Sequence, residues 1–187
     1  MRRERGRRSR NRERESIVSN EKIFFHKKNK TKARSQPTTL RRAEMGDEVD
    51  LHSAARAGDV DALGKCIAAG ADVNGPDRHK RTALHLAAYA GQLDAIRFLI
   101  ASGAKTAVEA MDGIAPLHFA CQKGHWEVAR ELINLGANQK ALNYKGENAL
   151  HFAALSGNQK LVEMLLRKQV NPCHRSKRGK LPSECAK

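Results

Sequence analysis

The sequence predicts an all-α repeat solenoid, in which pairs of short helices stack on one another and are joined by hairpin-like loops. A Leu-His pair recurs every 33 residues, at Leu51-His52, Leu84-His85, Leu117-His118 and Leu150-His151. Columns of glycine recur in the same register, and the apolar residues between them follow the spacing of one helical face. A period carried by several positions at once is typical of one supersecondary unit that is stacked several times. We therefore expect function on an extended surface and not in a catalytic pocket.

Each unit is expected to contain two helices, each ended by a glycine. The first helix follows the Leu-His pair and stops at the first glycine column, which comprises Gly58, Gly91, Gly124 and Gly157. In the second helix, apolar residues such as Leu93, Ile96 and Leu99 mark one face. Gln169 interrupts the glycine column that ends these second helices, and Lys80 interrupts a third column in the polar turn that follows. Because glycine takes a positive φ without a Cβ clash, we expect Gln169 to cost about 1 kcal/mol relative to glycine.

The period divides residues 47–187 into four full units and a partial fifth, at about 48–80, 81–113, 114–146, 147–179 and 180–187. The fifth unit has room for a hairpin strand and at most one helical turn. We therefore expect little cover over the apolar face of the last second helix, which consists of Leu161, Val162, Leu165 and Leu166. Three explanations stay open: a frayed C-terminus, a truncated gene model, or a partner that docks on this end.

The units resemble the ankyrin repeat, which opens with a Thr-Pro-Leu-His-like sequence. The matching stretches are 82–85, 115–118 and 148–151, and later signatures match at 124–129 and 70–74. The resemblance covers roughly residues 47–187 and implies stacked helix-turn-helix ankyrin repeats that bind proteins on a concave face. It also implies that the repeated histidines, His52, His85, His118 and His151, are structural, each bonded to the Thr hydroxyl of its own unit and to the backbone of a neighbouring loop. Only Thr82 supplies that hydroxyl here, because Ala115 and Asn148 replace it elsewhere.

Residues 1–44 differ sharply in composition from the repeats. They hold 16 Lys and Arg against 5 Asp and Glu, and so contribute +11 of the net charge of +15. With few apolar residues to offset the chain entropy lost on ordering, this Arg/Lys-rich tail is expected to be disordered. It is interpreted as a solvated extension, as a nuclear-localisation or nucleic-acid-binding arm, or as an organelle-targeting segment, although its acidic residues count against targeting. A further hypothesis is that the protein starts at Met45 and that the tail is not part of it.

Several classes of function find little support in the sequence. No apolar run approaches the length of about 20 residues needed to span a bilayer, so we expect no membrane attachment. Cys173, His174 and Cys185 lack a fourth ligand for zinc, and Cys66 and Cys121 are expected to be buried thiols. Phosphate-binding and hydrolase motifs are missing, and the carboxylates occupy helix-surface positions. We therefore expect no cofactor, no metal site and no enzymatic activity.

The candidate partner-binding residues lie on the hairpin tips and the first helices, at positions that packing does not fix. Tyr89, Met111, Ile114 and Tyr144 are larger and more apolar than a free surface requires, which indicates interface anchors on one apolar stripe. Basic residues dominate the first and last tips and favour a partner with an acidic rim. The full set is Arg78, His79, Arg81, Tyr89, Met111, Asp112, Ile114, Gln122, Lys123, Tyr144, Lys145, Glu147, Leu155, Lys177 and Arg178.

These features predict a non-enzymatic scaffold or adaptor for protein–protein interaction that is monomeric and resides in the cytoplasm, the nucleus or both. The alternative is a nucleic-acid-associated protein whose basic tail neutralises phosphates. That tail has few aromatic residues, namely Phe24 and Phe25, so such binding would be weakly specific.

Overall fold

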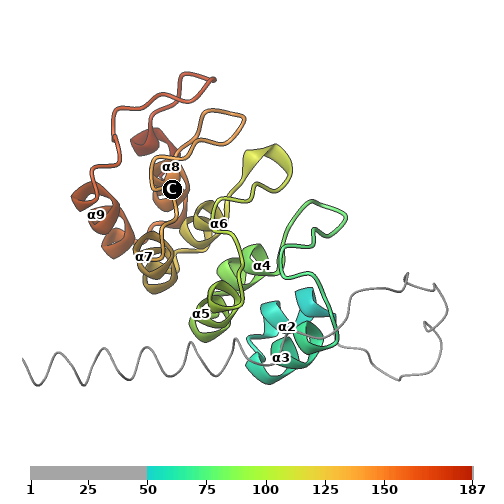
Figure 1. The fold of residues 1–187 in the computed structure, drawn as a ribbon. Helices are drawn as coiled ribbons and strands as arrows, with labels where there is room; N and C mark the ends of the chain where they lie inside the picture. Colours follow the sequence, from blue (N-terminus) through green and yellow to red (C-terminus); the bar gives the residue numbers. More distant parts are fainter. Residues whose placement is uncertain (1–49, 187) are drawn as a thin grey trace, which may run out of the picture. The chain divides into compact units, whose positions relative to one another are not determined.

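The computed structural model describes residues 50–186 (Figure 1). The expectations for residues 1–44 and for a start at Met45 fall outside the described residues. Within the described range the chain forms eight α-helices and two short 3-10 helices, with no β-strand. The α-helices are α2 (Leu51–Ala57), α3 (Val60–Ala68), α4 (Ala83–Ala90), α5 (Leu93–Ala101), α6 (Pro116–Lys123), α7 (Trp126–Asn134), α8 (Ala149–Ser156) and α9 (Gln159–Arg167). The 3-10 helices are η1 (Met111–Gly113) and η2 (Pro182–Cys185).

The first helix of every unit ends where the glycine period predicts. The glycine that follows it has a left-handed backbone, as at Gly91 with φ 81° and Gly157 with φ 71°. The two interruptions keep the same kind of backbone, because Lys80 has φ 57° and Gln169 has φ 59°. The chain therefore preserves the turn and accepts a conformation that is unfavourable for a residue with a Cβ atom.

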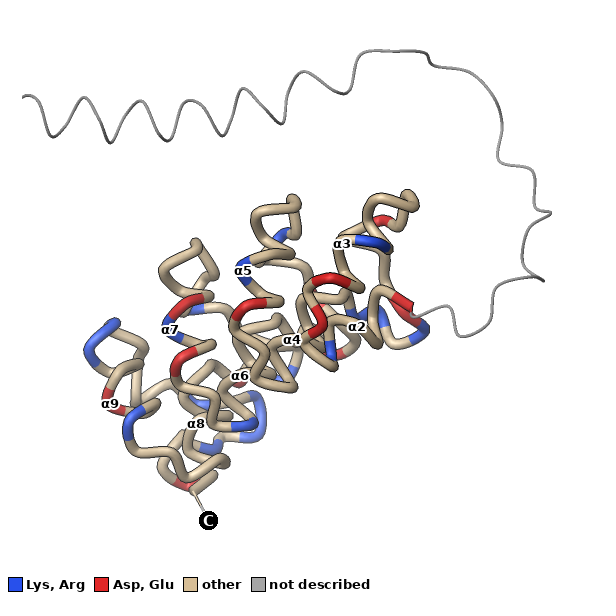
Figure 2. The backbone as a smooth tube through the Cα atoms, turned by 90° about the horizontal axis from the view of Figure 1, so that it is seen from below, with Lys and Arg blue, Asp and Glu red and all other residues tan. Residues whose placement is uncertain are grey.

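The helices stack in two rows, as the ribbon of Figure 1 and the backbone tube of Figure 2 show. The first helices α2, α4, α6 and α8 pack each on the next, and η2 packs on α8 in the position of a fifth first helix. The second helices α3, α5, α7 and α9 form the other row. Small side chains such as Ala54, Ala87 and Ala120 are fully buried between the layers, so the first helices approach closely. The stack itself is the hydrophobic core, as expected for a repeat solenoid.

The last second helix is better covered than the sequence suggested. Leu161 and Leu165 in α9 are fully buried, so the expectation of an open face is wrong for these two residues. They lie one turn apart on the side of α9 that packs against α7 and α8. Val162 and Leu166 lie on the adjacent side, where Val162 is half-buried and Leu166 is 43% exposed. The apolar stretch thus has two sides, and only one of them lacks cover.

Candidate partner-binding surface

Four hairpin tips, at residues 77–81, 110–114, 143–147 and 176–180, follow the helix pairs at equivalent positions of the repeat. In each tip the first residue donates its N–H to the carbonyl of the fifth, and the fourth donates to the carbonyl of the first. In the first tip, the Asp77 carboxylate accepts hydrogen bonds from the backbone N–H groups of His79 and Arg81 at 2.8 Å. It also forms an ion pair with the Arg81 guanidinium at 2.7 Å.

These bonds keep the Asp77 carboxylate of the first tip ionised. Partial burial raises the pKa of Asp77, but the hydrogen bonds from the Arg81 side chain and from the two backbone N–H groups outweigh it and lower the pKa to about 2. Asn143 makes equivalent hydrogen bonds in the third tip. Its side-chain oxygen accepts from the backbone N–H groups of Lys145 and Glu147, and its side-chain NH2 donates to the Glu147 carboxylate. Arg81 and Glu147 are therefore engaged within their own tips.

The second tip lacks these side-chain hydrogen bonds, because Ala110 occupies the position of Asp77 and Asn143. Here Asp112 takes a left-handed backbone with φ 65°, next to Gly113 with φ 71°. A non-glycine residue in this region is held there by its surroundings at some cost in backbone strain. This tip forms η1, and Met111, its second residue, is 53% exposed.

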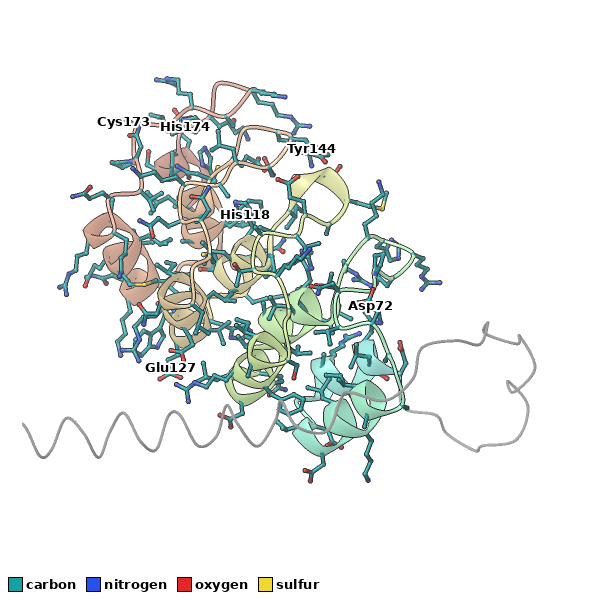
Figure 3. All side chains as sticks on the ribbon, viewed as in Figure 1. Asp72, His118, Glu127, Tyr144, Cys173 and His174 are labelled. Atoms are coloured by element: carbon teal, nitrogen blue, oxygen red, sulfur yellow. The ribbon has the colours of Figure 1, made fainter. Side chains whose placement is uncertain are left out.

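Successive tips are joined by backbone hydrogen bonds. Met111 N–H donates to His79 O at 3.2 Å, and Tyr144 N–H donates to Asp112 O at 2.9 Å. The Tyr144 ring lies against Gly113, since a Cβ on that glycine would come within 2.5 Å of the ring. The ring is nevertheless 63% exposed, and Figure 3 shows it at the hairpin loops, away from the helix core. Met111 and Tyr144 are thus neighbouring exposed apolar residues on adjacent tips.

The repeated histidines connect each first helix to the tip that follows. In α4, His85 Nδ1 accepts from the Thr82 backbone N–H at 3.1 Å and lies 2.9 Å from the Thr82 hydroxyl, while Nε2 donates to Ile114 O at 3.1 Å. His118 and His151 accept in the same way from the N–H of the residue three positions earlier. Their Nε2 atoms donate to carbonyls of the following loop at 3.1 Å, and His52 Nε2 contacts two such carbonyls.

At His85 and His118 this bonding pattern requires a neutral imidazole, because Nδ1 accepts and Nε2 donates. Burial agrees with that state. It lowers the pKa of His85 to about 4, and it also lowers the pKa of His118. Protonation of either ring would place a positive charge in a buried site, which costs free energy.

A second group of apolar residues lies on the first helices. The Tyr89 ring meets the Phe119 ring edge to face at 5.9 Å, and the Lys123 ammonium lies 4.5 Å from the centroid of the Tyr89 ring. Leu155, at the same register position as Tyr89 two units later, is 39% exposed. Phe119 was missing from the predicted set. The signal that could have found it is a large aromatic residue at the register position of Leu86, directly before the small residues Ala120 and Cys121.

The predicted residues do not form one apolar stripe. Tyr89 lies in the last turn of α4, and α4 begins directly after the first tip, so Tyr89 is about 9 Å along the helix from the hairpin end. Met111 and Tyr144 are at the tips, and Ile114 is half-buried at the base of its tip, where its carbonyl accepts from His85. The expectation of a single stripe is therefore corrected to two groups.

Most of the remaining candidates are exposed. Apart from Arg81, Tyr89, Ile114 and Glu147, which are partly buried, the predicted set is open to solvent: Arg78, His79, Met111, Asp112, Gln122, Lys123, Tyr144, Lys145, Leu155, Lys177 and Arg178. Basic residues of the tips flank the exposed pair Met111 and Tyr144, with Arg78 on one side and Lys177 and Arg178 on the other. Asp112 lies between them.

The described part of the chain lacks the geometry of a metal site and of a membrane-spanning helix. Between residues 50 and 186, no three His, Cys, Asp or Glu side chains come together in a way that could hold a metal ion. His174 instead bonds Gly146 O through Nε2 at 3.1 Å. Burial raises the pKa of the fully buried Cys121 thiol, whereas Cys66 is only half-buried, contrary to expectation. None of the described helices is long and apolar enough to cross a bilayer.

The stacked helix pairs and the histidine-to-carbonyl bonds define a helical repeat protein that presents an extended surface. A family model described as ankyrin repeats (3 copies) matches residues 103–176, and one described as ankyrin repeats (many copies) matches residues 51–100. The chain belongs to the ankyrin-repeat family, and its fold is the predicted all-α solenoid. Ankyrin repeats generally mediate protein–protein interaction and are typically non-enzymatic. A search of the curated proteins found no match to this chain.

Proposed function

We propose that this protein is a non-enzymatic scaffold or adaptor that holds a protein partner on the surface formed by its hairpin tips and first helices. The observation that carries the proposal is the exposed pair Met111 and Tyr144, which are 53% and 63% exposed on adjacent tips. Large apolar side chains at such positions are typical of interface anchors. The partner bears an acidic rim, because the cations of the first and last tips surround this pair.

The test is capture of partners from a cell lysate by the full chain, with and without nuclease, followed by mass spectrometry. The double variant Met111→Asp/Tyr144→Asp places charge at the proposed anchors and should abolish retention of the specific partner. Leu166→Asp is the matched control, because Leu166 is a similarly exposed apolar residue on α9, in the other row of helices.

Retention of every partner by the double variant would remove the hairpin tips from the interface. Loss of all partners after nuclease treatment would favour the alternative, a nucleic-acid-associated protein that acts through residues 1–44. The proposal also includes a monomeric state and a cytoplasmic or nuclear location, which light scattering and cell fractionation would check.

A further inference from the structure

Three side chains on successive first helices lie in a row next to Phe119. Arg56 in α2 and Tyr89 in α4 are one repeat apart and so hold the same register position on helices that pack against each other. Lys123 ends α6, the next helix of the row, and its ammonium lies 4.5 Å from the centroid of the Tyr89 ring. The polar end of Tyr89 is therefore placed between cations from two neighbouring units.

These cations have no carboxylate partner among residues 50–186. Arg81 and Arg97 are neutralised by Asp77 and Glu131, at 2.7 and 2.8 Å. Neither Arg56 nor Lys123 belongs to an ion pair in this part of the chain.

The charges that act on the Tyr89 hydroxyl all have the same sign. A hydrogen bond from Lys123 and the charge of Lys123 lower the pKa of Tyr89, and the charge of Arg56 lowers it further. A field made only by cations favours a negative group brought from outside.

The surroundings of this cluster indicate what kind of molecule carries that negative group. Phe119 contacts Tyr89 edge to face and forms an apolar base beside the cations. Further along the row the cations stop, because Leu155 stands at the register position of Arg56 and Ser156 at that of Lys123. A polyanion with evenly spaced charges would leave Leu155 facing its backbone. A peptide that carries an acidic side chain followed by an apolar one matches both parts of the row.

We propose that Arg56, Tyr89 and Lys123 form a subsite for one carboxylate side chain of the protein partner, with an apolar residue of the same segment lying against Leu155. The carboxylate accepts hydrogen bonds from the Tyr89 hydroxyl and the Lys123 ammonium, and the Arg56 guanidinium adds a second positive charge. This inference rests on the proposed function, and it sets the direction of the bound segment: acidic over α2, α4 and α6, apolar over α8.

The test uses nuclear magnetic resonance of the full chain with isotope-labelled tyrosine rings. The protein has only 2 tyrosines, so Tyr89 reports on the subsite and Tyr144 reports separately on the hairpin tips. The probe is a short acetylated peptide of alternating Glu and Leu residues, titrated at low ionic strength. The comparison titrations use the same peptide with Gln in place of Glu, inorganic phosphate, and an oligodeoxythymidylate.

We expect the Tyr89 signals to shift and saturate with the Glu-Leu peptide, and not with the Gln-Leu peptide. Lys123→Gln should raise the midpoint of that titration by about fivefold, the usual weight of one exposed charged contact. Lys160→Gln, which removes another exposed lysine, from α9, should leave the midpoint unchanged. Unchanged thermal unfolding of both variants would show that they fold.

Three results would overturn the assignment: Tyr89 signals that do not respond to the Glu-Leu peptide, equal effects of Lys123→Gln and Lys160→Gln, or tighter binding of phosphate or oligodeoxythymidylate than of the acidic peptide. The subsite and the proposed function can fail separately. If the captured partner is lost from Met111→Asp/Tyr144→Asp but Lys123→Gln binds it with the same midpoint as Lys160→Gln does, the scaffold function stands and the subsite fails. If the peptide binds at Tyr89 but the full chain retains no protein partner, the reverse holds.

Discussion

Gly91 and Gly157 end equivalent first helices, yet they are held by very different surroundings. Both have left-handed backbones, with φ of 81° and 71°. The His125 imidazole of the following unit stands against Gly91, so that a Cβ there would come within 2.8 Å of the ring. A Cβ on Gly157 would meet no atom within 4 Å. Equivalent residues of a repeat therefore carry different constraints, and the neighbouring unit sets them.

The largest expected effect comes from adding a methyl group at these two glycines. Gly91→Ala should lower the free energy of unfolding by about 2–4 kcal/mol, because it adds a clash with His125 to the strain of a positive φ. Gly157→Ala should cost only about 1 kcal/mol, from the backbone conformation alone. Urea unfolding followed by circular dichroism and by the fluorescence of Trp126, the single tryptophan, measures both.

A double-mutant cycle with His125→Ala isolates the contact. The imidazole also bonds Tyr89 O at 3.2 Å, so the single His125→Ala variant has a cost of its own. A coupling energy near zero would show that the backbone conformation alone sets the loss of stability. Equal decreases in the free energy of unfolding for the two glycine variants would show the same.

The second expected effect is a loss of stability in acid that is concentrated in the middle units. Since burial lowers the pKa of His85 to about 4, the unfolded chain takes up its proton near pH 6.5 and the folded chain only near pH 4. The contribution of His85 to the free energy of unfolding is therefore complete above about pH 6.5. It falls by on the order of 3 kcal/mol as the pH drops to about 4, and it does not change further below that pH. His118 acts in the same direction.

Urea unfolding between pH 7 and pH 4 measures this loss. His85→Gln should be less stable at pH 7 but should show a shallower decline, because the titrating ring is gone. Parallel declines for the two proteins would place the acid sensitivity elsewhere. The Asp77 carboxylate contributes in a lower window, because its stabilisation is lost only as the pH falls from about 4 to about 2.

The smallest expected effect concerns the fourth unit. Gln169 has φ 59°, where the equivalent Gly136 has φ 93°. Gln169→Gly should raise the melting temperature slightly and the free energy of unfolding by less than about 1 kcal/mol. The glycine relieves the strain of the left-handed backbone, but it also adds chain entropy to the unfolded state, which offsets part of the gain. Glu163→Gly is the opposite control, since a glycine in the middle of α9 should lower stability by about 1 kcal/mol. A loss with Gln169→Gly would mean that the side chain stabilises the loop more than the backbone strains it.

The sequence predicted the repeat architecture because its signals are local. The Leu-His pairs and the glycines specify where helices begin and end, and a left-handed turn survives even with Lys80 or Gln169 in place of glycine. The sides of α9 could not be predicted in the same way. Leu161 and Val162 are adjacent in sequence, but Leu161 is fully buried and Val162 only partly, so the extent of their burial depends on the neighbouring units.

The candidate surface was predicted in outline, by position in the repeat, but not in its grouping. Which exposed residues are free depends on partners that a linear pattern does not display. Arg81 is occupied by Asp77 and Glu147 by Asn143, whereas Lys123 has a ring beneath it and no carboxylate in the described part of the chain. The division between the tips and the first helices follows from the direction of each helix, which becomes clear only once the helices are placed in space.

The bridge formed by each repeated histidine has a consequence for how such a protein can change its length. His85 reaches Ile114 O and His151 reaches Lys180 O, 29 residues further along the chain, and His118 reaches Ala141 O, 23 residues further along, in the equivalent loop. Each copied segment therefore brings a donor for the loop that follows and an acceptor for the helix that precedes. Duplication of one such segment would lengthen the array without a new kind of joint, which is how a gene can extend a binding surface in equal steps.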